Sequence, residues 1–283
     1  MEPLVAPTAT LADGTTIPRL GFGVWQIGID EVVPAVAAAL DAGYRHVDTA
    51  AAYGNEQGVG RAVRASGLDR SEVTVVTKLR NGEQGYDAAI RACRDSIERL
   101  GLGPIDLYLI HWAAPRFGTF VETWRAFVTM RDEGLVRSIG VSNFNADHLE
   151  AIIAATGVTP VVNQVELHPY LQQPALRAFH AEHGIATEAW SPLGQGRGLL
   201  DDPTLADVAA AHGATPAQVA LAWQLALGNV AIPKSVSPAR IRENLEAVEL
   251  TLDAEDLARI TALDRAARFG ADPETVTFTQ MPG

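Results

Sequence analysis

Short apolar runs rich in β-branched residues recur along the chain, and most of them follow a segment whose apolar positions have helical spacing. A glycine commonly stands between the two, where it adopts at least cost the left-handed conformation that ends a helix; these are Gly43, Gly67, Gly101, Gly134, Gly157, Gly184 and Gly228. The runs show little polar alternation, which is typical of strands covered on both faces. They read RLGFGVW, RHVDTA, VTVVTK, IDLYLIHW, VRSIGVSN, VVNQVE, IATEAW and VAIPKS.

This alternation of strands and helices predicts an α/β fold with a parallel sheet and crossover helices. About eight such units in 283 residues favour a closed (β/α)8 TIM barrel. A doubly wound sheet is the weaker alternative, because GFGVW is only a fragment of the dinucleotide-binding pattern G-x-G-x-x-G. No linker or low-complexity segment interrupts the chain, so we interpret residues 1–283 as a single domain.

Two helices carry clear start signals. Thr215 is the expected N-cap of a helix in which Pro216 takes the first position and Gln218 completes a capping box. Ser237 followed by Pro238 predicts a similar opening for a later helix.

Some elements are expected outside the strict repeat. Helical segments 203–212 and 215–227 fall between the same two strands, and Asp253 is expected to cap a further helix through Leu263. Near the start, ATLADGTTIPRLG places an Asp-Gly turn between two short β-like runs. We interpret this stretch as an N-terminal hairpin that covers the floor of the barrel.

Composition and charge exclude several classes of protein. The chain is 47% hydrophobic and 20% charged, which is ordinary for a soluble globular protein. Its formal net charge of -12 argues against a nucleic-acid-binding surface. Neither a secretory signal nor a membrane-spanning stretch of about 18 apolar residues is expected. The single cysteine, Cys93, cannot form an internal disulfide, and its isolation fits a cytoplasmic location.

Polar or aromatic residues stand at the end of strand after strand. They are Asp48, Lys78, His111, Ser142, Asn143, Gln164, Trp190, Ser191, Lys234 and Ser235. Each has an ordinary structural explanation by itself, such as a turn aspartate or a solvated lysine. The carboxyl ends of barrel strands converge on one mouth, however, and active sites lie there. We therefore expect these side chains to form one constellation.

The first members of this constellation suit the reduction of a carbonyl group. Tyr53, shortly after Asp48, is a phenol with an ordinary pKa of about 10, which a neighbouring ammonium such as that of Lys78 would lower. Asp48 would hold the lysine in place, and His111 could donate a hydrogen bond to a carbonyl oxygen. No side chain supplies a hydride, so a nicotinamide or flavin is implied.

Three longer stretches resemble the signatures of the aldo-keto reductase family. They read GYRHVDTAAAYGNEQGVG, GLVRSIGVSNF and IPKSVSPARIREN, in the family's order and over most of the chain. The resemblance implies an NADPH-dependent barrel enzyme, and it places the catalytic tetrad at Asp48, Tyr53, Lys78 and His111. In these roles Tyr53 is the general acid, Lys78 tunes it with Asp48 as partner, and His111 orients the substrate carbonyl.

The resemblance also implies contacts with NADPH along the mouth. The nicotinamide end is expected at Ser142, Asn143, Gln164 and Trp190, and the pyrophosphate near Ser191 and Leu193. Val24 and Trp25 are also expected among the cofactor contacts. The adenosine end is expected at Lys234, Ser235, Val236, Arg240, Glu243 and Asn244. A lysine and an arginine around a helix start suit the 2′-phosphate, which favours NADPH over NADH.

The substrate side is expected to be walled by Trp25 and Trp112. The loops after the fourth and seventh strands and the tail beyond Phe269 are short, which resembles bacterial members such as the diketogluconate reductases and predicts an open site. Aldehydes, ketones, α-keto esters and keto sugars are the substrates that the resemblance implies. No metal, nucleic acid or membrane is expected as partner, and a monomer is expected because monomers are common in the family.

Two other functions compete with carbonyl reduction. Lys78 at a strand end in an apolar setting could form the Schiff base of an aldolase or lyase, although this leaves Tyr53 and the phosphate motif unexplained. A noncatalytic NADPH-binding sensor is the third possibility, against which the complete tetrad argues.

Overall fold

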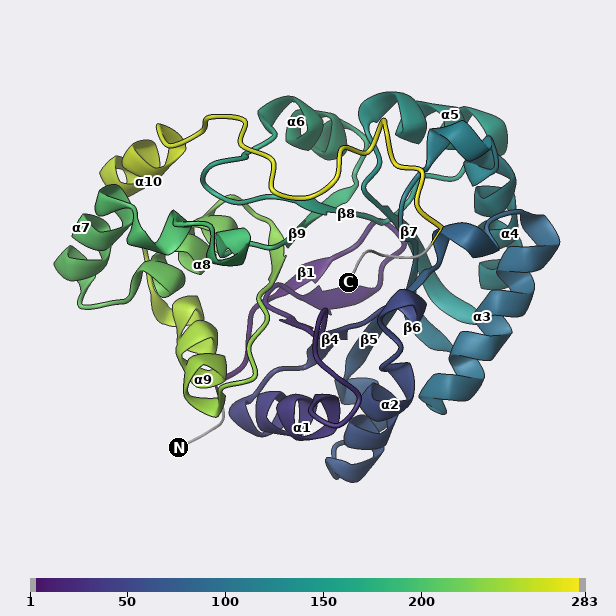
Figure 1. Cartoon of the computed structure of the whole chain (residues 1–283), viewed down its shortest axis with the longest axis horizontal. Helices are drawn as coiled ribbons and strands as arrows, with labels where there is room; N and C mark the ends of the chain where they lie inside the picture. The colour runs from purple at the N-terminus through teal and green to yellow at the C-terminus, as the bar shows by residue number, and fades with distance from the viewer. Residues whose placement is uncertain (1–3, 280–283) are drawn as a thin grey trace.

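The computed structural model describes residues 4–279 and contains a closed parallel barrel (Figure 1). Eight strands pair in sequence order; they are β3 (Phe22–Gly23), β4 (His46–Asp48), β5 (Thr74–Leu79), β6 (Ile105–Ile110), β7 (Val136–Ser142), β8 (Val162–Glu166), β9 (Ala186–Trp190) and β10 (Val230–Ile232). The sheet closes where Leu20 bridges Ala231 and the Gly21 amide donates to the Ala231 carbonyl at 2.9 Å. The predicted (β/α)8 architecture is confirmed.

The helices surround the barrel (Figure 1). They are α1 (Val32–Ala42), α2 (Glu56–Ala65), α3 (Tyr86–Leu100), α4 (Phe120–Asp132), α5 (Ala146–Thr156), α6 (Pro174–Glu182), α7 (Pro203–His212), α8 (Pro216–Ala226), α9 (Pro238–Glu246) and α10 (Ala254–Thr261). As predicted, α7 and α8 lie between the same two strands and α10 follows the repeat. Within residues 4–279, none of the helices has both the length and the apolar character that a bilayer crossing requires.

The predicted helix starts are largely as the sequence indicates. Thr215 caps α8, and Gln218 completes the box by accepting from the Thr215 amide at 2.9 Å. Asp253 caps α10, which ends at Thr261 and so is shorter than expected. Ser237 occupies the N-cap of α9 but makes no side-chain cap, and its own amide donates to Ser235 Oγ at 3.1 Å.

An antiparallel hairpin of β1 (Thr8–Thr10) and β2 (Thr16–Pro18) precedes the barrel. Leu11 and Ile17 of this hairpin pack against apolar side chains of the barrel interior, namely Val76, Leu107, Leu109, Val162 and Val230. Ser138 Oγ donates to Asp13 Oδ2 at 2.7 Å and fixes the turn. The hairpin therefore covers the barrel floor, as predicted, and leaves the opposite end open for a site.

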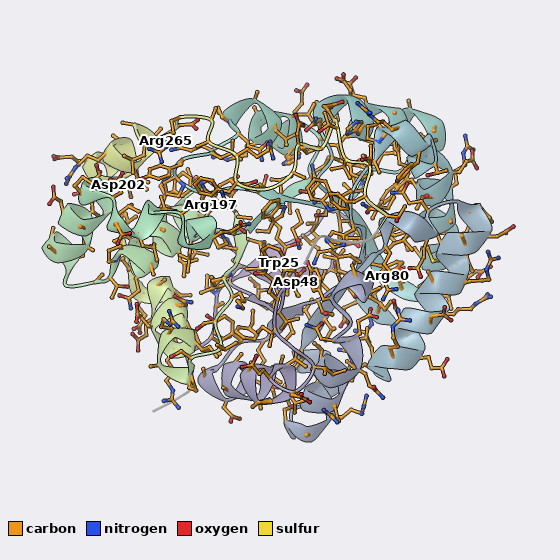
Figure 2. The ribbon with its side chains drawn as sticks, viewed as in Figure 1. Trp25, Asp48, Arg80, Arg197, Asp202 and Arg265 are labelled. Atoms are coloured by element: carbon orange, nitrogen blue, oxygen red, sulfur yellow. The ribbon has the colours of Figure 1, made fainter. Side chains whose placement is uncertain are left out.

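The chain after α10 crosses the barrel mouth. In Figure 1 this yellow segment runs from α10 past α6 and α5 towards β7. The buried Glu166 carboxylate at the end of β8 anchors it by accepting the amides of Phe269 at 2.6 Å and Gly270 at 2.8 Å. Closer to α10, Arg265 lies over the Tyr170 ring at 3.6 Å from its centroid (Arg265 is labelled in Figure 2).

Candidate active site

The open end of the barrel holds a pocket of about 750 Å³. Its walls come from the carboxyl ends of most strands and the loops that follow them, including Asp48, Tyr53, His111, Ser142, Asn143, Gln164, Trp190, Lys234 and Arg240. In Figure 2, Trp25 and Asp48 are labelled near the centre of the ring of helices, and both line this pocket. Another hollow of about 570 Å³ lies around the hairpin and contains none of the predicted site residues.

The predicted tetrad lies together at the base of the mouth. Lys78 Nζ donates to Asp48 Oδ1 at 2.6 Å and to the Thr49 carbonyl at 2.9 Å, and the ammonium is fully buried. The same nitrogen lies 5.2 Å from the centroid of the Tyr53 ring. The Tyr53 ring meets the His111 ring edge to face, with 5.7 Å between centroids. Lys78 thus stands between the carboxylate and the phenol, as the sequence predicts.

The loop after β4 is built to hold Tyr53 in this position. A short 3₁₀ turn, η1 (Ala51–Tyr53), follows the strand, and its small alanines leave room beside the mouth. Asn55 braces the loop: its Oδ1 accepts from Thr49 Oγ1 at 2.7 Å and its Nδ2 donates to the Val24 carbonyl at 3.0 Å. Asn55 was not singled out from the sequence, because an asparagine before a helix usually only caps it.

Charge and burial set the protonation states at the tetrad. Burial alone would lower the pKa of Lys78, but the Asp48 carboxylate and the Tyr53 phenol raise it above its ordinary value, so the amine stays an ammonium. Burial also lowers the pKa of His111 well below its ordinary value, and the Lys78 charge adds to this. His111 is therefore a neutral imidazole at neutral pH and can donate only through the nitrogen that carries its single proton.

The acidity of Tyr53 differs from the sequence expectation. Enclosure by neighbouring groups raises the pKa of the phenol to about 12, and Asp48 contributes in the same direction. The Lys78 ammonium lowers this pKa, as predicted, but does not outweigh burial. The expected net lowering below 10 is thus wrong for this structure, and the effect of Lys78 is to limit the rise.

A second polar group lies beside the tetrad, at the ends of β7, β8 and β9. Asn143 adopts a left-handed conformation with φ of 58°, and its Nδ2 donates to the His111 carbonyl at 2.9 Å. Its Oδ1 accepts from Trp190 Nε1 at 2.8 Å. Ser142 Oγ donates to the Gln164 carbonyl at 2.8 Å, and Gln164 Nε2 donates to Asp48 Oδ2 at 2.8 Å. The residues predicted at the nicotinamide end are therefore tied to one another and to the tetrad.

The predicted phosphate and adenosine residues divide into two sets. Ser191, Leu193, Lys234 and Arg240 line the pocket, and the two cations are exposed. Val24, Ser235, Val236, Glu243 and Asn244 are absent from its lining. Their side chains have other surroundings: Val24 is in the hydrophobic core, Asn244 is buried, and Glu243 Oε1 accepts from Thr215 Oγ1 at 2.8 Å. Contacts from these five to a cofactor stay predictions.

The substrate side contains both predicted tryptophans and further residues that the sequence did not indicate. Trp25 and Trp112 line the pocket, and Phe278 from the C-terminal segment meets Trp112 edge to face, with 5.6 Å between centroids. Ala271 lines it as well. The tail is short but crosses the mouth, so the site is more enclosed than expected. The apolar Val276 and the aromatic Phe278 in this tail were the available signal.

The loop after β9 also borders the pocket. It contributes Gln195 and Arg197, and Arg197 lies over the Phe269 ring at 5.6 Å from its centroid (Arg197 is labelled in Figure 2). Two segments far apart in sequence therefore meet above the mouth. The sequence indicated this loop as short but did not predict that it contacts the tail.

Comparison with known proteins gives a consistent assignment. The model of the Aldo/keto reductase family matches residues 19–265. An aldo-keto reductase of Mycobacterium sp. strain JLS is 56% identical over 97% of this chain and 99% of its own length. The methylglyoxal reductase DkgA of Yersinia pestis is 48% identical over 97% of each chain. A mutant of Gox0644 crystallised in complex with NADPH is 48% identical, covers 97% of this chain and 100% of its own, and superposes with a TM-score of 0.93. The chain belongs to the aldo/keto reductase family.

Proposed function

We propose that the protein reduces aldehydes and ketones to alcohols with NADPH, using Tyr53 as the proton donor. The observation that carries this proposal is the Lys78–Asp48 ion pair of 2.6 Å placed against the Tyr53 ring, with the neutral His111 ring at its edge. The barrel mouth thus brings together a proton donor, a fixed positive charge and a neutral hydrogen-bond donor. This combination suits the reduction of a carbonyl group, whose oxygen becomes an alkoxide.

The residues divide this work among themselves. His111 donates a hydrogen bond to the substrate carbonyl oxygen and fixes its position. Tyr53 transfers its phenolic proton to that oxygen as negative charge develops there. Lys78 stabilises the resulting phenolate and is itself held by Asp48. When bound, the nicotinamide supplies the hydride that no side chain can provide.

The pocket residues fit such a cofactor. Gln164 uses both N–H bonds of its amide, towards Asp48 and Glu188, so its Oε1 remains as an acceptor for a carboxamide. Trp190 is partly buried and offers an aromatic face near this point. Lys234 and Arg240 line the same pocket and provide positive charge. The NADPH complex of the Gox0644 mutant, similar over nearly the full chain, supports the same cofactor.

Arg240 provides the sharpest test of the cofactor assignment. Arg240→Ala is expected to weaken NADPH binding by about tenfold to a hundredfold, since a hydrogen bond between charged groups contributes about 1.5–3 kcal/mol. NADH, which lacks the 2′-phosphate, should lose less than about threefold. Both dissociation constants can be measured by quenching of tryptophan fluorescence.

Arg242→Ala is the matched control, because Arg242 is an exposed arginine on the same helix and does not line the pocket. Equal losses for NADPH and NADH in the Arg240 variant would mean that the phosphate is bound elsewhere.

An unused donor in the pocket wall supports a narrower substrate class. The buried Trp112 Nε1 has no hydrogen-bond partner among residues 4–279. We propose that it serves an oxygen next to the reacting carbonyl, such as that of an α-oxo aldehyde, an α-keto ester or a keto sugar. The similarity to a methylglyoxal reductase supports this class.

Lys78 argues against the Schiff-base alternative. An amine that attacks a carbonyl must be neutral, whereas Asp48 keeps this one charged. Borohydride trapping with substrate would label Lys78 only in a Schiff-base enzyme. We further propose that the chain acts as a monomeric, single-domain enzyme in the cytoplasm, where its free and buried Cys93 would stay reduced.

The proposed activity is tested by a panel of carbonyl compounds assayed for loss of NADPH absorbance. Compounds with a neighbouring oxygen should react with higher kcat/KM than simple aldehydes of similar size. If no carbonyl compound consumed NADPH, the proposed function would be wrong.

A further inference from the structure

Two ionisable side chains face each other inside the barrel, below the tetrad. His46 lies two residues before Asp48 on β4, and Glu188 lies two residues before Trp190 on β9, so all four point to the barrel interior. His46 and Glu188 are fully buried, and His46 Nε2 lies 3.4 Å from Glu188 Oε1. Gly21 makes room for the ring, since a Cβ there would lie 2.5 Å from His46 Nδ1.

The hydrogen bonds of His46 fix where its proton lies. His46 Nδ1 is 3.2 Å from the Pro18 carbonyl, which can only accept, so Nδ1 carries the hydrogen. In the neutral ring Nε2 is then an acceptor. It has no hydrogen-bond partner in the described part of the chain, and neither has Glu188 Oε1. Two bare acceptors facing each other in the protein interior would repel, so one proton must lie between them.

Burial assigns that proton to the glutamic acid at neutral pH. It raises the pKa of Glu188 to about 8, and the Asp48 charge contributes in the same direction. Burial lowers the pKa of His46 to about 4. Glu188 therefore carries a hydroxyl that can donate to His46 Nε2, and the pair is uncharged.

A continuous set of hydrogen bonds connects this pair to the tetrad. Glu188 Oε2 accepts from Gln164 Nε2 at 3.1 Å, and the same amide nitrogen donates to Asp48 Oδ2 at 2.8 Å. The other Asp48 oxygen accepts from Lys78, which lies against Tyr53. A change of charge on Glu188 is thus transmitted to the proton donor through one amide and one ion pair.

We propose that Glu188 is a positioning residue for carbonyl reduction: with His46 it holds one proton beneath the tetrad, and loss of that proton weakens Tyr53 as an acid. This inference rests on the function proposed above. The proton leaves from the Glu188 carboxyl group to solvent, and no other bond changes.

The groups around Glu188 determine the sign of the effect. Its charged or titratable neighbours are Asp48 and His46 on β4 and Lys78 on β5. The two strands that pair with β9, namely β8 and β10, place the neutral residues Gln164 and Val230 opposite Glu188. Below pH 8 Glu188 is neutral and Lys78 has one buried carboxylate as partner. Above pH 8 a second negative charge lies beneath Asp48, so the phenol becomes a weaker acid and reduction slows.

The pH profile of Glu188→Gln tests this role. In the wild type, kcat/KM for NADPH-dependent reduction should fall on the order of threefold through a step near pH 8 to a lower plateau. Glutamine can donate to His46 and accept from Gln164 as the neutral acid does, but it cannot ionise. The variant should therefore lack the step, while Glu182→Gln, an exposed control at the end of α6, should keep it.

A second measurement needs no variant. Infrared spectroscopy of the wild type with 13C-labelled glutamate should show the C=O band of a buried protonated carboxyl at pH 6.5, and this band should disappear with a midpoint near pH 8. Absence of the band, or a step that persists in Glu188→Gln, would overturn the inference while leaving carbonyl reduction intact. Absence of NADPH-dependent reduction in the wild type at every pH would instead overturn the proposed function.

Discussion

Tyr53→Phe is expected to lower kcat for carbonyl reduction by about 10²–10⁴-fold, the range over which a positioned proton donor contributes. Phenylalanine keeps the ring that packs against His111 and Lys78 but has no proton to give. The pocket and its tryptophans stay in place, so NADPH should still quench the tryptophan fluorescence with a nearly unchanged dissociation constant.

Tyr86→Phe is the matched control for this substitution. Tyr86 lies on α3, 40% exposed, and its hydroxyl contacts Thr129 rather than the pocket. Loss of the Tyr86 hydroxyl should leave both kcat and the dissociation constant of NADPH unchanged. Normal turnover by Tyr53→Phe would show that Tyr53 is not the proton donor. Loss of NADPH binding would show that the substitution disturbs the pocket and does not simply remove the proton.

Lys78→Met is expected to cause the largest combined loss of activity and stability. The ammonium is fully buried, and methionine would leave the Asp48 carboxylate buried without its charged partner. Breaking such a pair from one side costs about 3–5 kcal/mol. The free energy of unfolding, measured in denaturant, should fall by about this amount, and reduction should become undetectable because the phenolate loses its counter-charge.

The double variant Asp48→Asn/Lys78→Met separates the two effects. It removes both charges, so most of the lost stability should return. Activity should not return, because no positive charge is left beside Tyr53. Stability losses that simply add in the double variant would show that the two residues do not act as a pair.

The barrel was predictable because its signals are local and repeated. Strands such as β5 and β6 are rich in apolar residues with little polar alternation, and the helix before β6 ends at Gly101, which has φ of 61°. The tetrad was predictable for a related reason. The carboxyl ends of parallel strands always meet at one mouth, so Asp48, Lys78 and His111 were expected together before any distance was known.

The errors and omissions come from contacts that no local pattern records. Phe278 and Ala271 reach the pocket because residues far earlier in the chain hold the C-terminal segment: Glu166 accepts the Phe269 and Gly270 amides, and Asn81 Nδ2 donates to the Phe278 carbonyl at 3.0 Å. Glu188 and His46 looked like ordinary strand residues, and their pairing depends on barrel closure. The pKa of Tyr53 depends on how completely neighbouring groups enclose it, which charge spacing alone does not give.

The side chains that the motif assigns to the adenosine end have different surroundings. Lys234 and Arg240 line the pocket, whereas the Ser235 hydroxyl accepts an amide at the start of α9 and the Glu243 carboxylate accepts from Thr215 at the start of α8. A motif identifies a segment whose backbone is needed at a site, but not which of its side chains point there.

The most direct test of the proposed reaction is transfer of the nicotinamide hydrogen itself. NADPH carrying two deuterium atoms at C4 should be mixed with the wild-type protein and methylglyoxal, and the alcohol product examined by NMR. We expect one deuterium on the new alcohol carbon and one NADPH consumed per product formed. An alcohol without deuterium, or no alcohol at all, would contradict hydride transfer from NADPH to a carbonyl in this pocket.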